Sequence, residues 1–170
     1  MTTRGRTPHR TKSHAPVRQW RESKSVRRTR VSIIVRRLRQ LYPNAAAELT
    51  YADPFQLLTA VILSAQTTDV AVNKVTPLLF ARYPTPEALA AAPQMDVENI
   101  VHATGFYRQK ARSIRATAGQ LVEDFDGEVP KSMDSLLTLP GVARKTANVV
   151  LGEAFGIASG IVVDTHVARL

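Results

Sequence analysis

The chain has 170 residues, of which 44% are hydrophobic and none is cysteine, and its formal net charge is +9. This length allows one sizeable core or two small ones. The lack of cysteine excludes disulfides, thiolate catalysis and cysteine-ligated metals within these residues. No run approaches the ~18 uninterrupted apolar residues of a membrane helix, and the start has no secretory signal. We therefore expect a cytoplasmic protein with no membrane partner.

The positive charge is concentrated in residues 1–30, which hold ten Lys or Arg and one acid, Glu22, whereas basic and acidic residues balance from residue 31 onward. This stretch is rich in Thr, Ser, Pro and Arg, so we predict a basic disordered leader. Such a leader would attract phosphate backbones in a salt-dependent way. The alternatives are a solvated leader without a dedicated role and, less favoured, an organelle transit peptide.

Beyond the leader, apolar residues recur with helical period and no stretch alternates like a strand, which predicts an all-α protein. Val31, Ile34, Val35, Leu38 and Leu41 form the first apolar stripe, closed by Pro43. We expect Asp53, Asp69, Thr85, Asp96 and Ser132 to start helices. The expected helices cover about 31–41, 53–65, 69–83 with a kink at Pro77, 85–92, 96–104, 107–125, 132–138 and 144–156. Residues 162–163 should be extended, and Asp164 or Thr165 should cap a final helix.

Residues 139–145 read Leu-Pro-Gly-Val-Ala-Arg-Lys, a tight turn that opens onto an apolar-periodic segment. The free N–H groups at such a helix start bind phosphate. Together with the flanking helices the turn predicts a helix-hairpin-helix over about 132–155, a module that grips nucleic-acid backbone through main-chain N–H groups. The alternative is an ordinary connection between two antiparallel helices.

Lys145 lies beside Arg144 at the positive end of the second hairpin helix, which favours the neutral amine that attacks carbonyl-like carbon. Asp164 follows after that helix and a return of the chain. Alone, Lys145 would be a solvated helix lysine and Asp164 an N-cap. Together, an amine and a carboxylate beside a phosphate-binding turn suit imine chemistry at a sugar anomeric carbon.

Several separated motifs resemble the endonuclease III family of DNA glycosylases. They are Leu-Pro-Gly-Val-Ala-Arg-Lys-Thr-Ala-Asn-Val-Val at 139–150 with Val-Asp-Thr-His at 163–166, Leu-Ser-Ala-Gln-Thr-Thr-Asp at 63–69 with Val72-Asn73-Lys74, and Gly105-Phe106-Tyr107 with Lys110-Ala111. The resemblance runs from about residue 31 to the end. It implies the helix-hairpin-helix glycosylase fold, with a six-helix domain over 45–156. Residues 31–44 and 157–170 would belong to an incomplete second domain, with the active site between the two.

The resemblance implies a base-excision-repair glycosylase with abasic-site lyase activity. Lys145 would displace the damaged base and form a Schiff base with the deoxyribose, and Asp164 would activate it; β-elimination then cuts the strand 3′ to the lesion. The implied partner is duplex DNA with oxidised pyrimidines or abasic sites, bound by a nucleoid-associated monomer. Two alternatives stay open: a non-catalytic DNA-binding fragment, and a monofunctional adenine glycosylase, which Lys145 disfavours.

The target nucleotide must leave the stack for such chemistry. The resemblance makes Gln66 the residue that fills the vacated space and Phe106 an apolar wedge beside it; the plain alternatives are a polar helix end and a core aromatic. Lys110 would touch phosphate or be a solvated charge, and His166 would line the cleft or bond across its helix start. The hairpin contributes DNA-binding residues Leu139, Pro140, Gly141, Val142, Ala143 and Arg144.

Two departures from the family pattern stand out. Ala143 occupies the place of a second hairpin glycine, and its Cβ would disfavour a positive φ or crowd a phosphate. The four cysteines that hold a [4Fe-4S] cluster in full-length members are absent, so we expect no cofactor and no metal in this chain. With one wall of the cleft missing, we expect the 170 residues alone to be unstable or weakly active.

Overall fold

The computed structural model describes residues 22–44, 48–163 and 169. The chain divides into two compact units, residues 1–45 and 46–170. The described residues form helices and connections without strands, as the sequence predicts. Among the helices described, none is long and apolar enough to cross a membrane.

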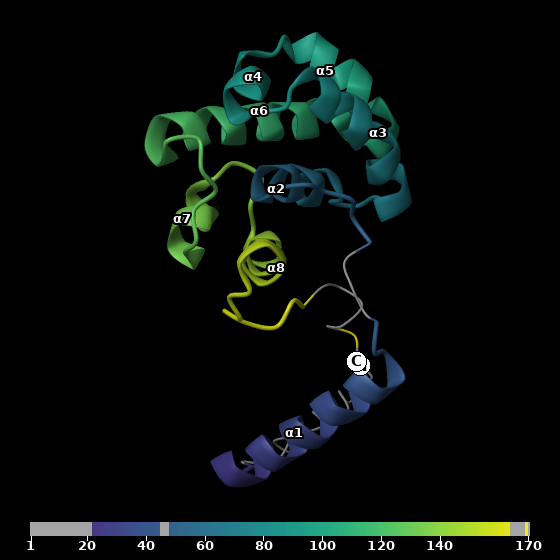
Figure 1. The fold of residues 1–170 in the computed structure, drawn as a ribbon, viewed down its shortest axis with the longest axis vertical. Coiled ribbons are helices and arrows are strands. Elements are labelled where there is room, and N and C mark those ends of the chain that lie inside the picture. The colour runs from purple at the N-terminus through teal and green to yellow at the C-terminus, as the bar shows by residue number, and fades with distance from the viewer. Residues whose placement is uncertain (1–21, 45–47, 164–168, 170) are drawn as a thin grey trace, which may run out of the picture. The chain divides into compact units, whose positions relative to one another are not determined.

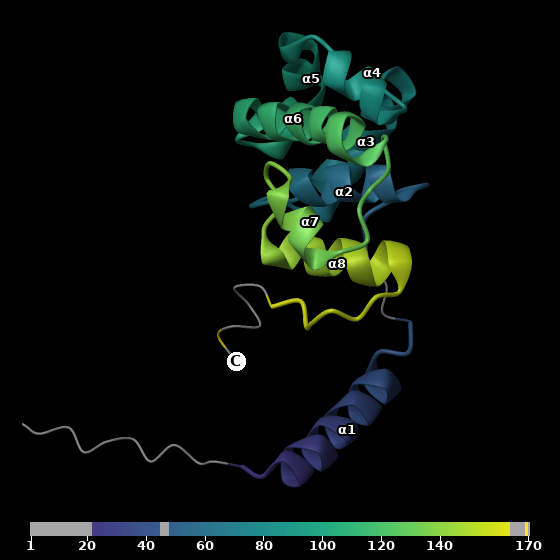
Figure 2. The ribbon, with the colours of Figure 1, turned by 90° about the vertical axis from the view of Figure 1, so that its left-hand side faces the viewer.

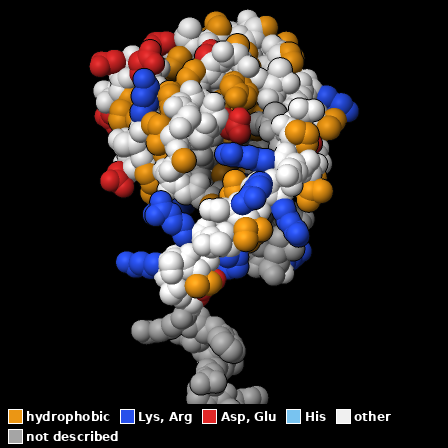
Figure 3. All heavy atoms as spheres, turned by 60° about the horizontal axis from the view of Figure 1, so that its bottom comes forward, with side chains coloured by type: hydrophobic (Ala, Val, Ile, Leu, Met, Phe, Trp, Pro, Cys, Tyr) orange, Lys and Arg blue, Asp and Glu red, His pale blue; other side chains and the backbone are white. Residues whose placement is uncertain are grey.

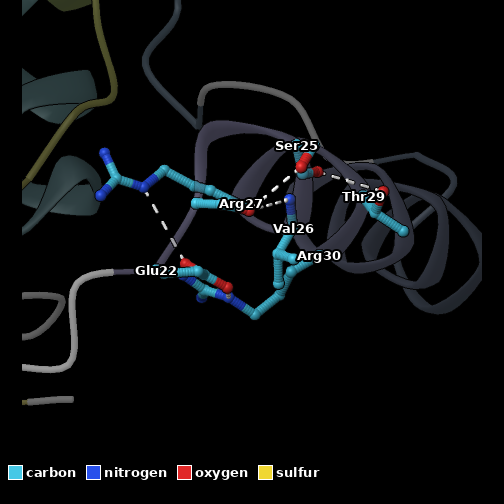
Figure 4. A network of polar contacts seen from close by, with 7 residues as sticks. Glu22, Ser25, Val26, Arg27, Thr29 and Arg30 are labelled. Atoms are coloured by element: carbon cyan, nitrogen blue, oxygen red, sulfur yellow. Dashed lines mark hydrogen bonds and ion pairs between the residues drawn. The ribbon is translucent and has the colours of Figure 1, made fainter.

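The described part of the first unit, residues 22–44, contains one helix, α1 (Lys24–Leu41), which begins seven residues before the predicted start at Val31. The prediction of disorder was therefore wrong for residues 24–30, which are helical. Ser23 caps the helix by accepting a hydrogen bond from the Val26 amide. Glu22 accepts two hydrogen bonds from the Arg30 guanidinium, at 3.0 and 2.7 Å (Figure 4). Arginine and lysine are good helix formers, so a basic composition is compatible with a capped helix.

The apolar stripe of α1 is exposed, and no residue of this helix is buried. Lys and Arg side chains lie beside the apolar side chains along this helix (Figure 3). The pairing of residues 31–44 with 157–170 in one domain stays a prediction.

The centre of the second unit is α2 (Pro54–Leu63), which lies between α6 and α8 (Figure 1, Figure 2). All of its residues from Leu57 to Leu63 are buried, as expected for a helix that is apolar all round. Asp53 caps it as predicted, accepting from the Gln56 amide at 2.8 Å. A buried helix thus packs against both α6 and α8.

The other helices have the following bounds: α3 Asp69–Arg82, α4 Pro86–Ala91, α5 Gln94–Val101, the 3₁₀ turn η1 His102–Thr104, α6 Tyr107–Phe125, α7 Met133–Thr138 and α8 Arg144–Phe155. α6 packs against α4, α5 and α2, and α8 packs against α2 and α7. One apolar core contains buried side chains from every α-helix between α2 and α8 in the chain, both included.

Two predicted helix starts were wrong by one or a few residues. Thr68 caps α3 in place of Asp69, which lies in the first turn. Pro93 precedes α5, and Asp96 lies inside it, where it accepts a hydrogen bond from the Tyr83 hydroxyl and forms an ion pair with Arg82. A carboxylate in the first turn also favours the helix dipole, so sequence alone does not separate the two positions.

Candidate active site

The hairpin between α7 and α8 packs directly on α6 and α2 at Gly141. Its φ is +79°, and a Cβ built there would lie 3.0 Å from Ser113 Cβ and 3.3 Å from Ile62 Cγ2. Residues other than glycine rarely adopt this φ, and real Cβ atoms rarely come this close to a neighbouring atom. Glycine is therefore required at this position for two reasons: the backbone has a positive φ, and there is no room for a Cβ atom.

Two hydrogen bonds and two buried side chains also fix the hairpin. The Thr117 hydroxyl of α6 donates to the Pro140 carbonyl at 2.6 Å, and the Val142 amide donates to the Leu139 carbonyl at 3.1 Å. Leu139 and Val142 are buried in the core. The side chains of these two predicted DNA-binding residues therefore anchor the turn from inside, whereas Gly141 and Ala143 are exposed. Contact of the hairpin with DNA stays a prediction.

The start of α8 carries no side-chain cap. Ala143 is its N-cap residue, with φ −99° and ψ 171°, whereas Ser132 caps α7 through its hydroxyl. Since φ is negative, the concern that Ala143 must adopt a positive φ was wrong. Arg144 and Lys145 follow, both exposed in the first turn. Uncapped N–H groups beside two cations are suited to hold a phosphate.

A pocket of about 350 Å³ adjoins the hairpin. It brings together four of the predicted residues, Gln66, Phe106, Lys110 and Gly141, which come from distant parts of the sequence. Ile62, Ala65, Gln109 and Ser113 complete its lining. Lys145 follows four residues after Gly141, in the first turn of α8.

Gln66 and Phe106 both adopt left-handed backbone conformations, with φ of 54° and 46°. Such conformations cost about 1–3 kcal/mol in a residue other than glycine and concentrate at functional sites. Gln66 is exposed, and Phe106 is 70% exposed. The alternative that Phe106 is a core aromatic was therefore wrong: its ring stands in solvent at the pocket.

Lys110 is not the solvated charge that the sequence allowed. Only 5% of the residue is exposed, and its amine donates to the Thr104 carbonyl at 2.7 Å. Burial lowers the pKa of the Lys110 amine from its ordinary value. The amine is therefore hydrogen-bonded to Thr104, which lies two residues before Phe106 in the chain.

Asp164 and His166 lie outside the described residues, so the pairing of Lys145 with Asp164 stays a prediction. The segment that leads to Asp164 is tied to α8, because the Ser159 hydroxyl bonds the Asn148 side chain at 3.0 Å. The part of the chain that the structure describes contains no group of three or more His, Asp or Glu able to hold a metal. With no cysteine in the sequence, these residues do not fit an iron–sulfur cluster ligated by thiolates.

The chain is similar to proteins of DNA base excision repair. The family model of the HhH-GPD superfamily of base excision DNA repair proteins matches residues 59–170. Endonuclease III of Synechocystis sp. is 57% identical over 148 residues, which cover 87% of this chain and 66% of that protein. The chain belongs to the endonuclease III family of this superfamily.

Two solved structures of endonuclease III share the fold. One is a non-covalent complex with DNA, with a TM-score of 0.77, 45% identity and coverage of 83% of this chain and 65% of that chain. The other is a trapped covalent intermediate with DNA, with a TM-score of 0.78, 45% identity and coverage of 83% and 66%. These matches confirm the predicted helix-hairpin-helix glycosylase fold. The chain spans slightly less than two thirds of the length of these endonuclease III proteins.

Sequence reasoning missed three residues that hold the candidate site together: Thr104, Ser113 and Thr117. Ser113 and Thr117 share one face of α6 with Lys110, at positions i, i+3 and i+7. All three are buried. Polar residues at helical spacing on a buried face were the available signal, because buried polar groups require partners.

Proposed function

We propose that the protein is a DNA glycosylase with abasic-site lyase activity, acting on oxidised pyrimidines and abasic sites in duplex DNA. The observation that carries the proposal is the pocket that gathers Gln66 and Phe106 against Gly141, with Lys145 in the next turn of the chain. An amine beside an uncapped helix start can meet a sugar whose phosphate that helix binds.

The DNA would be gripped without base readout through the N–H groups at the start of α8, with Arg144 adding charge. The target nucleotide leaves the stack, which costs a few kcal/mol. Phe106 would enter the duplex as a wedge and offset part of this cost, while Gln66 occupies the vacated space. The exposure of both residues and their left-handed backbone support this role.

The proposed chemistry uses the Lys145 amine as the nucleophile. Its lone pair attacks C1′ of the deoxyribose, and the bond to the base breaks with the electrons leaving on the base, which takes up a proton. The amine, now bonded to C1′, loses one proton; its lone pair then breaks the C1′–O4′ bond, O4′ takes up a proton, and a protonated Schiff base forms. Removal of a C2′ proton then expels the 3′ phosphate by β-elimination. Asp164 would steady the positive charge and move protons.

Borohydride trapping on a duplex with an abasic site tests the proposal, because hydride reduction of the Schiff base makes the link to DNA permanent. We expect the wild-type chain to cross-link and Lys145→Ala to give no cross-link. Lys131→Ala is the matched control, since Lys131 is an exposed lysine beside Phe155, and it should cross-link like wild type.

Equal cross-linking by Lys145→Ala would remove Lys145 as the nucleophile. Salt-sensitive duplex binding by wild type without cross-linking or cleavage would instead favour the non-catalytic DNA-binding alternative. On a duplex that carries an oxidised pyrimidine, base release without strand cutting would favour a monofunctional glycosylase.

A further inference from the structure

Lys110 holds the backbone on both sides of Gly105. Its main-chain amide donates to the Phe106 carbonyl at 3.1 Å, and its side-chain amine donates to the Thr104 carbonyl at 2.7 Å. One residue of α6 therefore bonds the carbonyl groups of the two residues that flank Gly105 in the chain. Both bonds therefore restrain the backbone of Gly105 and Phe106.

The backbone between these two hydrogen bonds is conformationally strained. Gly105 and Phe106 both have positive φ, 67° and 46°, and a phenylalanine in this region is strained. Thr104 is 1% exposed and donates its hydroxyl to the Val101 carbonyl at 2.8 Å. The segment is thus anchored at Thr104 and strained immediately after it, while the Phe106 ring stands in solvent.

An apolar side chain would fill the space of Lys110 without the cost of burying an amine, a cost visible in its lowered pKa. The amine therefore supplies something that packing alone does not. Its described bond goes to the loop of Phe106. By contrast, Arg115 on the same helix directs its guanidinium to Gln94 and to the Ala90 carbonyl, away from the pocket.

We propose that Lys110 is a positioning residue that holds Phe106 ready to enter the duplex, by bonding the Thr104 carbonyl from beneath the loop. This inference rests on the proposed function, in which Phe106 is the wedge. It assigns the buried amine an indirect role, through Phe106, in place of direct contact with phosphate.

The experiment compares Lys110→Met, which keeps an unbranched stem and removes the amine, with Lys110→Arg, which keeps a charged donor, in the full chain. Hydrogen exchange of the amides of residues 104–107 in the free protein reports on the loop. Insertion is read by the fluorescence of 2-aminopurine placed next to a tetrahydrofuran abasic analogue in a duplex. This analogue blocks the lyase reaction, so binding is measured without turnover.

We expect Lys110→Met to exchange faster at residues 104–107, to lose the fluorescence change and to bind the abasic duplex about tenfold more weakly. Binding to the same duplex without a lesion should stay unchanged, and Lys110→Arg should restore part of the signal. In a Phe106→Ala background Lys110→Met should cause no further loss. Arg115→Met, the matched control on α6, should retain the signal.

Unchanged exchange and fluorescence in Lys110→Met would overturn the inference, as would an equal additional loss in the Phe106→Ala background. Weaker binding to intact and abasic DNA alike would also overturn it, since it would show a general phosphate contact or a loss of fold. If Lys110→Met does not fold, the Lys110→Arg variant decides by the same readouts. If wild type itself does not distinguish the abasic duplex, the proposed function fails and takes this inference with it, which separates the two failures.

Discussion

The Thr117 hydroxyl donates to the Pro140 carbonyl across 2.6 Å and thereby ties α6 to the hairpin. Ser113 lies one turn earlier on the same face, directly under Gly141, and Lys110 holds the loop of Phe106 one turn before that. A single face of α6 therefore sets the distance between the hairpin and the wedge. Because a helix is stiff over two turns, the hairpin and the loop of Phe106 keep a fixed spacing.

Thr117→Val should destabilise the protein by about 1–3 kcal/mol, because it leaves the Pro140 carbonyl without its partner in a part-buried position. Urea unfolding measures the change. Thr138→Val is the control: this hydroxyl is exposed and donates to the Ser135 carbonyl, so its loss should cost less. Equal losses for the two variants would argue against a special role for Thr117.

Gly141→Ala should destabilise the protein by about 1–3 kcal/mol and weaken duplex binding, since the new Cβ meets Ser113 and requires a strained φ. Gly152→Ala provides the contrast. Gly152 lies within α8 with open space where its Cβ would stand, so alanine should stabilise by about 0.5–1 kcal/mol. Thermal unfolding and a duplex-binding titration would show the opposite signs; a neutral Gly141→Ala would contradict the close packing.

Phe106→Ala should change the free energy of unfolding by no more than about 0.5 kcal/mol, because the ring is 70% exposed. It should nevertheless remove the preference for abasic over intact duplex, which competition binding measures. A large loss of stability would indicate that the ring belongs to the core after all.

The contribution of Lys110 to stability should rise with pH. Its pKa in the folded protein lies below the ordinary value of 10.5 because the amine is desolvated. Between the two pKa values the unfolded chain binds more protons, so stability increases with pH in that window. Urea unfolding of wild type and Lys110→Met at pH 7.5 and near 10 checks this, since groups such as Tyr83 are common to both proteins. The prediction fails if the difference in unfolding free energy is flat or shifts against wild type.

Much of the helical layout could be predicted because its signals are local. Asp53 with Pro54 and Ser132 mark helix starts through caps that depend only on neighbouring residues. The start of α1 was missed because composition was taken as evidence of disorder, whereas the cap at Ser23 and the bond from Arg30 to Glu22 suit a helix.

The candidate site was only partly predictable, for a different reason. Gln66, Phe106 and Gly141 could be named from motifs. That Lys110 is buried, and that Thr117 holds Pro140, depends on segments 6 and 23 residues apart meeting in space. A lysine in a predicted helix gives the same sequence signal whether it is exposed or buried against a carbonyl group.

The bare N-terminus of α8 has a consequence for how the protein's stability is divided between its free and bound states. Ala143→Asp would supply the missing cap and should stabilise the free protein by about 1 kcal/mol. The same carboxylate would occupy the amides and repel the phosphate that the proposed function brings there, so duplex binding should weaken as the melting temperature rises. In the natural chain the phosphate itself would complete the helix, and the protein would reach its greatest stability only when seated on DNA.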